Sequence, residues 1–259
     1  MLIAVLACTY AFTHSVKPQW EATAWIQIGQ VGPVPPGLDP KVEPLLRVIE
    51  RLQLVPFENE ILESIGFASD SPEAQLYRNS LKLEPMPYAG PLVRLNVRAR
   101  SPQQARQFAT ATVTRLQAVH RQLEVLPLKY AHEHLAQVEM DLRDALADRA
   151  RLLQVAASGA RGDAAGKGIA GMLLANKNED VRNLQQARSD LMDRLGPIYT
   201  FETSMPWPVY VPERQAFPNP ALMWGIGLLL GMFLAAFAAT TRNVARRAAS
   251  RRAASIASA

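Results

Sequence analysis

The stretch SGARGDAAGKG at 158–168 sets a lysine among glycines, the combination that binds phosphate in nucleotide-binding loops. Such a loop needs four residues between its two glycines, and a hydroxyl after the lysine to hold magnesium. Here three residues separate Gly162 from Gly166, and Gly168 follows Lys167. The flanking segments are also predicted helices, whereas a phosphate loop follows a strand. The spacing therefore argues against nucleotide binding.

Histidines and acids on the predicted helices form no reactive group. His132 and His134 flank Glu133, but residues two apart diverge by about 200° around a helix and cannot grip one metal ion together. Asp141 and Asp144 lie on a charge-rich helical face, where solvation is the ordinary role of a carboxylate. No serine or cysteine nucleophile motif is visible. We therefore expect a protein that is not an enzyme and has no catalytic residue, cofactor or metal.

Three arginines on a predicted strand indicate a binding or salt-bridged surface rather than a catalytic site. In PLVRLNVRARS at 91–101, apolar residues alternate with Arg94, Asn96, Arg98 and Arg100, and this period of two predicts a strand. The three arginines then share one face. Two explanations stay open: the face contacts an anionic glycan, or it is the solvated or salt-bridged outer face of a sheet. The second is the more common.

Other short elements are expected before this strand. WEATAWIQIGQV at 20–31 alternates in the same way and predicts a strand, followed by a Pro/Gly loop over 31–40. Apolar residues three and four apart predict an amphipathic helix over 41–54, and a second short helix is expected over 57–66. Together these elements form the α/β part of the expected domain.

Helical signals dominate from residue 101 onward. Ser101, Pro102 and Gln104 form a helix start, and the helix is expected to continue until Pro127 bends or breaks it. A further helix and a return helix follow, joined by the glycine-rich stretch, so that helices over about 102–195 form a long antiparallel hairpin. Their apolar stripes are narrow and leave little core. We therefore expect the hairpin to pack against copies of itself.

An uncharged apolar segment lies near the C-terminus. No ionisable residue occurs between Pro220 and Thr241, and about twenty helical residues cover the roughly 30 Å of a bilayer's hydrocarbon core. We predict a transmembrane helix over 217–241. Five arginines follow in the tail 242–259, namely Arg242, Arg246, Arg247, Arg251 and Arg252. Positive charge beside a span favours the cytoplasmic side and contact with anionic lipid.

The overall charge agrees with membrane lipids as a partner. The net charge is +5, which the five tail arginines alone match. A basic excess confined to such a tail indicates membrane lipid and excludes DNA or RNA as the partner. Cys8 is the single cysteine, so no intramolecular disulfide is possible.

The N-terminal stretch MLIAVLACTYAF is apolar but short. About twelve helical residues reach only about 20 Å, and a secretory signal would begin with basic residues. Three explanations compete: an atypical signal, a short interfacial anchor, or a first transmembrane helix over 1–13, truncated because the start codon was set too late. We favour the third. Residues 14–216 then form one external domain.

Small residues recur on one face of the C-terminal span. Gly227, Gly231 and Ala235 follow one another at intervals of four, a spacing that lets another helix approach closely. The expected partner is the N-terminal span of the same or a neighbouring chain. The alternative is that glycine is simply common in membrane helices.

Three segments, in this order, resemble one family. WEATAWIQIGQVG at 20–32 resembles an alanine-containing strand ending in glycine, and VRLNVRARSPQQARQFATATVTRL at 93–116 resembles a strand, a Ser/Asp-Pro pair and a helix. VPERQAFPNPALMWGIGLLLGMFLAAF at 211–237 resembles a proline-rich approach to a glycine-bearing second span. Their order and placement are similar to those of the Wzz-type polysaccharide co-polymerases, or chain-length determinant proteins, of Gram-negative inner membranes.

That resemblance implies an α+β membrane protein, in which two transmembrane helices flank a periplasmic α/β base domain with a long helical hairpin. It implies cytoplasmic termini and a ring of protomers that sets the modal length of a surface polysaccharide. The chain resembles the short type associated with lipopolysaccharide O-antigen. The implied partners are further copies of the chain, a Wzy-type polymerase, lipid-linked polysaccharide and membrane lipids.

Two other classes remain as alternatives. A periplasmic adaptor of an export system also carries a helical hairpin, but it usually has one anchor and two half-motifs of a lipoyl-like domain. The second span argues against it. A membrane-anchored enzyme that modifies glycans comes third, because no acid–base constellation is present.

Overall fold

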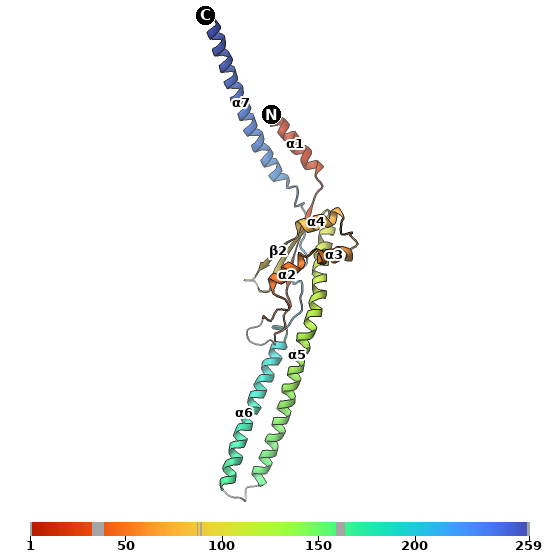
Figure 1. Cartoon of the computed structure of the whole chain (residues 1–259), viewed down its shortest axis with the longest axis vertical. Helices are drawn as coiled ribbons and strands as arrows, with labels where there is room; N and C mark the ends of the chain where they lie inside the picture. Colours follow the sequence, from red (N-terminus) through yellow and green to blue (C-terminus); the bar gives the residue numbers. More distant parts are fainter. Residues whose placement is uncertain (1, 33–38, 87, 89, 159–163, 258–259) are drawn as a thin grey trace.

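The computed structural model describes residues 2–32, 39–86, 88, 90–158 and 164–257. In chain order the elements are α1 (Leu2–Ser15), β1 (Trp20–Gln27), α2 (Leu45–Leu52), α3 (Val55–Ser64), α4 (Pro72–Ser80), β2 (Lys82–Met86), β3 (Leu92–Ala99), α5 (Pro102–Ser158), α6 (Ala164–Leu195) and α7 (Pro220–Ala257). The molecule is elongated (Figure 1). Helices α1 and α7 lie at one end, the sheet with its short helices in the middle, and the hairpin of α5 and α6 at the other end.

The middle region is built on a three-stranded antiparallel sheet in the order β1-β3-β2. The two strands predicted from alternation, β1 and β3, pair along their whole length from Trp20–Ala99 to Gln27–Leu92. Alternate residues of both strands are buried on one face. The opposite face carries the polar residues, so the period of two in the sequence separates a core face from an outer face.

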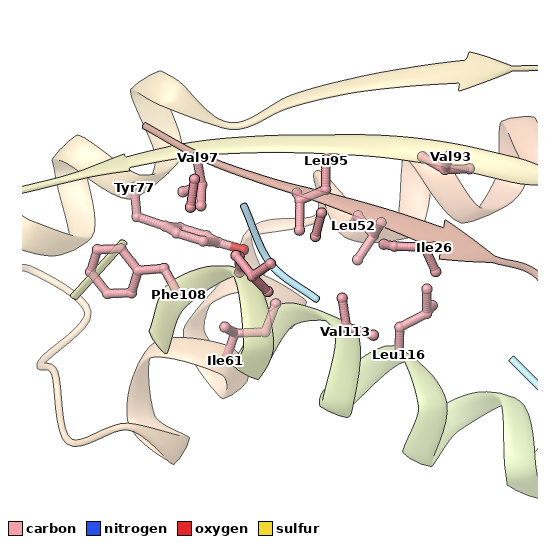
Figure 2. Close-up of a cluster of buried hydrophobic side chains, with 14 of the residues drawn as sticks. Ile26, Leu52, Ile61, Tyr77, Val93, Leu95, Val97, Phe108, Val113 and Leu116 are labelled. Carbon is pink, nitrogen blue, oxygen red and sulfur yellow. The ribbon is translucent and has the colours of Figure 1, made fainter. Parts of the chain in front are cut away.

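The buried face of the sheet packs against the beginning of α5 (Figure 2). Phe108 of α5 and Tyr77 of α4 meet edge to face, with ring centroids 5.3 Å apart. Burying each apolar side chain of this size contributes about 1.5–3 kcal/mol to stability. The Tyr77 hydroxyl lies 2.9 Å from the hydroxyl of Thr112, and burial raises the pKa of Tyr77 well above its usual range. The phenol therefore stays neutral inside the core.

Two elements, α4 and β2, were not predicted from the sequence. Helix α4 begins where the Ser71 hydroxyl accepts a hydrogen bond of 3.1 Å from the Ala74 N–H, with Pro72 in the first turn. Strand β2 is mostly exposed, and its Pro85 breaks the apolar pattern of a strand. It is an edge strand, where proline is tolerated. Its backbone pairing with β3, and not its side chains, makes it a strand.

Helix α5 runs from Pro102 to Ser158 without a break, so of the two expected effects of Pro127, a bend or a break, the break does not occur. A proline removes the hydrogen bond to the carbonyl four residues earlier, here that of Leu123. Leu123 is 42% exposed, so water can reach this part of the helix. Beyond the proline, packing against α6 keeps the helix formed.

The long hairpin expected over about 102–195 is present, with α5 and α6 packed side by side (Figure 1). The seam on α5 consists of Ala131, Val138 and Ala145, which are buried and recur every seven residues. On α6, Val181 is buried. These small side chains make a thin seam. Residues 159–163 of the glycine-rich connection lie outside the described residues.

One helix among the described residues is long and apolar enough to cross a membrane. It covers Ala221–Thr241, 21 residues with a mean hydropathy of 2.1, and 11% of its most apolar window is buried within the chain. The exposed apolar surface fits a lipid environment. Helix α1 has 14 residues, so a second span at the N-terminus stays a prediction. Helix α7 continues beyond the apolar segment and carries the basic tail to Ala257.

Candidate functional surfaces

Helices α1 and α7 of one chain pack together at the glycine face of α7. Gly227 and Gly231 are buried, and Ala235 is half-buried. A Cβ atom added to Gly227 would lie 2.5 Å from Oγ1 and 3.1 Å from Cγ2 of Thr9 in α1. The absence of a side chain at Gly227 therefore allows α1 and α7 to approach each other closely beside Thr9. Gly225 on the same helix is exposed, and a Cβ atom there would meet nothing within 4 Å.

The five tail arginines lie on the last turns of α7. Its backbone is helical through this region, but the side chains of 242–259 lie outside what the structure describes. The expected contact with anionic lipid, from Arg242 to Arg252, thus stays a prediction.

Arg94 and Arg98 lie on the outer face of β3 and have acidic partners across the strands, whereas Arg100 directly follows the strand. Arg94 stands opposite Glu84 of β2 and pairs with it. Arg98 stands opposite Glu21 of β1, with 2.8 Å between its Nε and a carboxylate oxygen. Arg100 donates at 3.4 Å to the backbone carbonyl of Lys17. This geometry agrees with a salt-bridged outer face, in which such exposed pairs contribute about 0.2–1 kcal/mol each.

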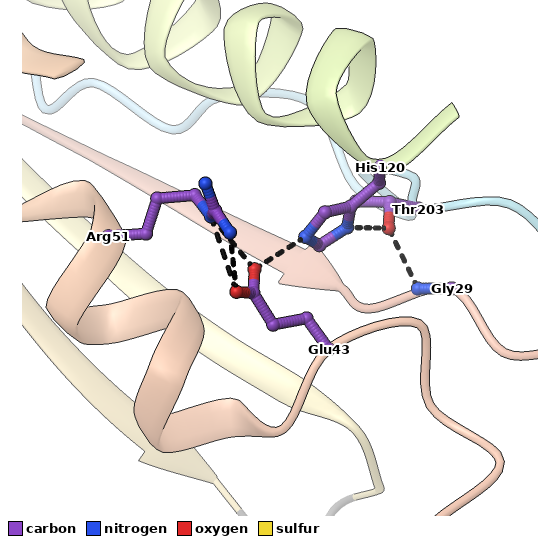
Figure 3. A network of polar contacts seen from close by, with 5 residues as sticks. All are labelled: Gly29, Glu43, Arg51, His120 and Thr203. Atoms are coloured by element: carbon purple, nitrogen blue, oxygen red, sulfur yellow. Dashed lines mark hydrogen bonds and ion pairs between the residues drawn. The ribbon is translucent and has the colours of Figure 1, made fainter. Parts of the chain in front are cut away.

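A buried polar network joins the sheet to the start of the hairpin (Figure 3). Arg51 of α2 holds the carboxylate of Glu43 with hydrogen bonds of 2.8–3.3 Å. The ring of His120, fully buried on α5, lies 3.3 Å from Glu43 through Nε2 and 2.5 Å from the Thr203 hydroxyl through Nδ1. The same hydroxyl accepts a bond of 2.8 Å from the Gly29 N–H.

The partners in this network determine its protonation. Glu43 can only accept at the His120 ring, so Nε2 carries the proton and Nδ1 accepts from the Thr203 hydroxyl. Burial lowers the pKa of His120 below its ordinary value despite the nearby carboxylate. Burial alone would raise the pKa of Glu43, but hydrogen bonds and charges from Arg51 and His120 outweigh it and lower the pKa. His120 is therefore neutral, and the neighbouring Glu43 is ionised.

Glu124 lies one turn after His120 on α5 and is 4% exposed. Its Oε1 atom has no hydrogen-bond partner among the described residues, while the Thr203 N–H donates to the carboxylate. Burial raises the pKa of Glu124, and the charge of Glu202 raises it further. A Cβ atom on Gly29 would lie 2.6 Å from Oε1, so the glycine allows the acid to fit.

These buried polar residues were not predicted from the sequence. His120 and Glu124 follow the core residues Val113 and Leu116 at helical spacing. Polar residues that continue an apolar stripe are the available signal, because only a partner from another element makes their burial favourable. Glu43 and Thr203, 77 and 83 residues away from His120 in the chain, are not recognisable from the sequence.

No protein-family model matches the chain, and no curated protein sequence does. Among solved structures, a full-length bacterial polysaccharide co-polymerase matches with 13% identity and a TM-score of 0.38, over 95% of this chain and 92% of that chain.

The chain is similar to polysaccharide co-polymerases.

A second similar structure is a mutant of the Shigella flexneri lipopolysaccharide O-antigen chain-length regulator. It has 12% identity and a TM-score of 0.26, over 76% of this chain and 99% of that chain.

The hairpin exposes apolar side chains that α5 and α6 do not cover. Those at least half exposed include Val125, Leu126, Tyr130, Ile169, Met172 and Leu173. Besides the buried seam, ion pairs join the two helices, with Arg188 3.0 Å from Glu139 and Lys177 3.6 Å from Asp148. The histidines His132 and His134 are both exposed. The described residues contain no group of three or more histidine, cysteine or acidic side chains arranged for a metal ion.

Proposed function

We propose that the protein controls the modal chain length of a surface polysaccharide, namely lipopolysaccharide O-antigen. It acts as a ring-like homo-oligomer in the bacterial inner membrane, beside a Wzy-type polymerase and its lipid-linked substrate. Helix α1 is the first span, α7 is the second, and residues between them are periplasmic. The protein has a regulatory and not a catalytic role.

The observation that carries this proposal is that the chain returns, after the hairpin, to the end of the molecule where α1 lies. After the hairpin, the chain runs back beside β1, with Ser204 paired to Gln27 and Tyr210 to Thr23. It then enters α7, which packs against α1 at the end opposite the hairpin (Figure 1). An apolar helix over Ala221–Thr241 anchors that end in a membrane. The hairpin therefore projects away from the membrane surface.

Assembly into a homo-oligomer is supported by what the hairpin leaves uncovered. Its seam of Ala131, Val138 and Ala145 is thin, and Met172 near the tip is 73% exposed. A second copy of the hairpin would bury such side chains. Several long hairpins side by side form a wall, and closed cyclic symmetry turns the wall into a ring.

A gel of surface polysaccharide tests the proposal. Deletion of the coding sequence is expected to replace a modal band of long chains by a distribution that decreases steadily with length. Expression of the intact chain from a plasmid should restore the band, and a variant lacking 220–259 should not. An unchanged band pattern in the deletion strain contradicts the proposal.

A further inference from the structure

Trp207 is a large aromatic side chain held in an exposed position on the outer side of β1. It is 51% exposed, and its ring meets that of Trp25 edge to face with centroids 6.0 Å apart at 78°. The two indoles form a corner with two nearly perpendicular walls. Tyr210, three residues later, is 59% exposed.

The backbone around Trp207 is shaped to present it. Ser204 pairs with Gln27 and Tyr210 with Thr23, so six residue steps on this segment run beside four on β1. The extra length bulges outward at Pro206-Trp207-Pro208, where two prolines restrict the backbone. Val209 is buried in the core and anchors the bulge. The exposed indole is therefore preorganised.

Polar groups border the corner on the same face of the sheet. The Thr23 hydroxyl donates to the Asn96 carbonyl oxygen at 2.7 Å, so the amide nitrogen of Asn96 retains its two N–H donors. Arg94, opposite Trp25 in the register, is paired with Glu84. Because the Arg94 guanidinium already has a carboxylate partner, the residue opposite Trp25 offers no unpaired charge to a ligand, and Lys82 lies beyond Asn96 on β2.

We propose that Trp25, Trp207 and Asn96 form a binding site for an uncharged glycan. A pyranose ring has an apolar face of C–H groups that fits an indole wall, and its hydroxyls accept from an amide and exchange hydrogen bonds with a paired guanidinium and carboxylate. The rigid bulge lowers the entropy lost on binding. The site itself does not depend on the proposed function. Only the identification of its glycan with the polysaccharide whose length is controlled rests on that function.

The test measures binding by the full-length protein in lipid nanodiscs. The probes are dextran, mannan and the neutral surface polysaccharide of the producing organism, with heparin-derived oligosaccharides as anionic competitors. Binding to at least one neutral probe is expected, with a loss of about tenfold or more in Trp207→Ala and in Asn96→Ala. Trp207→Tyr should retain part of the affinity. Tyr88→Ala, which removes a fully exposed aromatic side chain between β2 and β3, is the matched control and should bind as the wild type does.

Several results would overturn the site. These are no binding to any neutral probe, equal binding by Trp207→Ala, or preference for the heparin-derived competitor. A loss of oligomeric mass in Trp207→Ala, measured by mass photometry, would make the corner a contact between copies instead. Circular dichroism excludes unfolding, and Asn96→Ala tests the site without touching the indoles. Unchanged chain length in the deletion strain, together with glycan binding by the purified protein, would refute only the proposed function.

Discussion

At the scale of single residues, the buried acids and histidine at the start of the hairpin are the most informative. His120, Glu43 and Thr203 satisfy one another's hydrogen bonds, so their burial is favourable. Glu124, one turn further along α5, has an oxygen without a partner among the described residues. A carboxylate in that position is less favourable than a carboxylic acid. The link between sheet and hairpin is therefore expected to depend on pH.

Glu124→Gln tests this dependence. Because the folded protein raises the pKa of Glu124 above the ordinary value of 4.5, the folded state holds its proton more tightly, and stability falls as pH rises from about 4.5 through the raised pKa. Glutamine does not titrate, so the variant should gain thermal stability relative to the wild type over that range. Arg121 and Glu202 stay in place as the charges facing the site. The measurement is the melting temperature against pH. A pH-independent difference contradicts the raised pKa.

At the scale of elements, the contact between α1 and α7 depends on small side chains. Gly227 is buried against Thr9, whereas Gly225, two residues earlier, faces open space. Packing of membrane helices gains little from the hydrophobic effect and depends on close approach. Two glycines in one helix are thus expected to respond very differently to the same substitution.

Replacement of Gly227 and Gly231 together by leucine should separate α1 from α7. A Cβ atom at Gly227 already collides with Thr9, while leucine keeps the segment apolar, so membrane insertion should survive. We expect weaker crosslinking between the spans in membranes and a broadened distribution of polysaccharide length. Gly225→Leu is the matched control and should leave both readouts unchanged. Identical oligomers and modal length in the double variant would mean that the glycines only reflect composition.

At the scale of the whole molecule, the helices α1 and α7 lie at the end opposite the hairpin (Figure 1). The return segment runs antiparallel to β1 and brings α7 beside α1. Exposed apolar side chains occur at the membrane end and along the hairpin. The first set meets lipid in the proposed arrangement, and the second meets neighbouring copies.

The proposed topology places both termini in the cytoplasm and the hairpin tip in the periplasm. Alkaline phosphatase, which is active only in the periplasm, should be inactive when fused after Ala259 and active when inserted near Gly162. The arginines beside α7 are the physical reason, since positive charge disfavours translocation. Substitution of the five tail arginines by glutamine should weaken this orientation. Phosphatase activity at the C-terminus of the unaltered chain would reverse the topology.

Sequence alone determined the features that rest on local pattern. The uncharged run before Arg242 predicts the membrane helix α7, period-two alternation predicts β1 and β3, and helical signals over 102–195 predict the hairpin. Each pattern expresses a physical preference of neighbouring residues, so it can be recognised without knowing the fold.

Only the tertiary structure decided the features that depend on distant partners. Strand β2 forms because β3 offers its backbone, and α5 continues through Pro127 with α6 packed beside the residues that follow. The polar network needs His120 and Thr203, 83 residues apart, and the aromatic corner needs Trp25 and Trp207 from different segments. These contacts gain their energy from burial and hydrogen bonds between remote residues, and no pattern along the chain records which remote residues will meet.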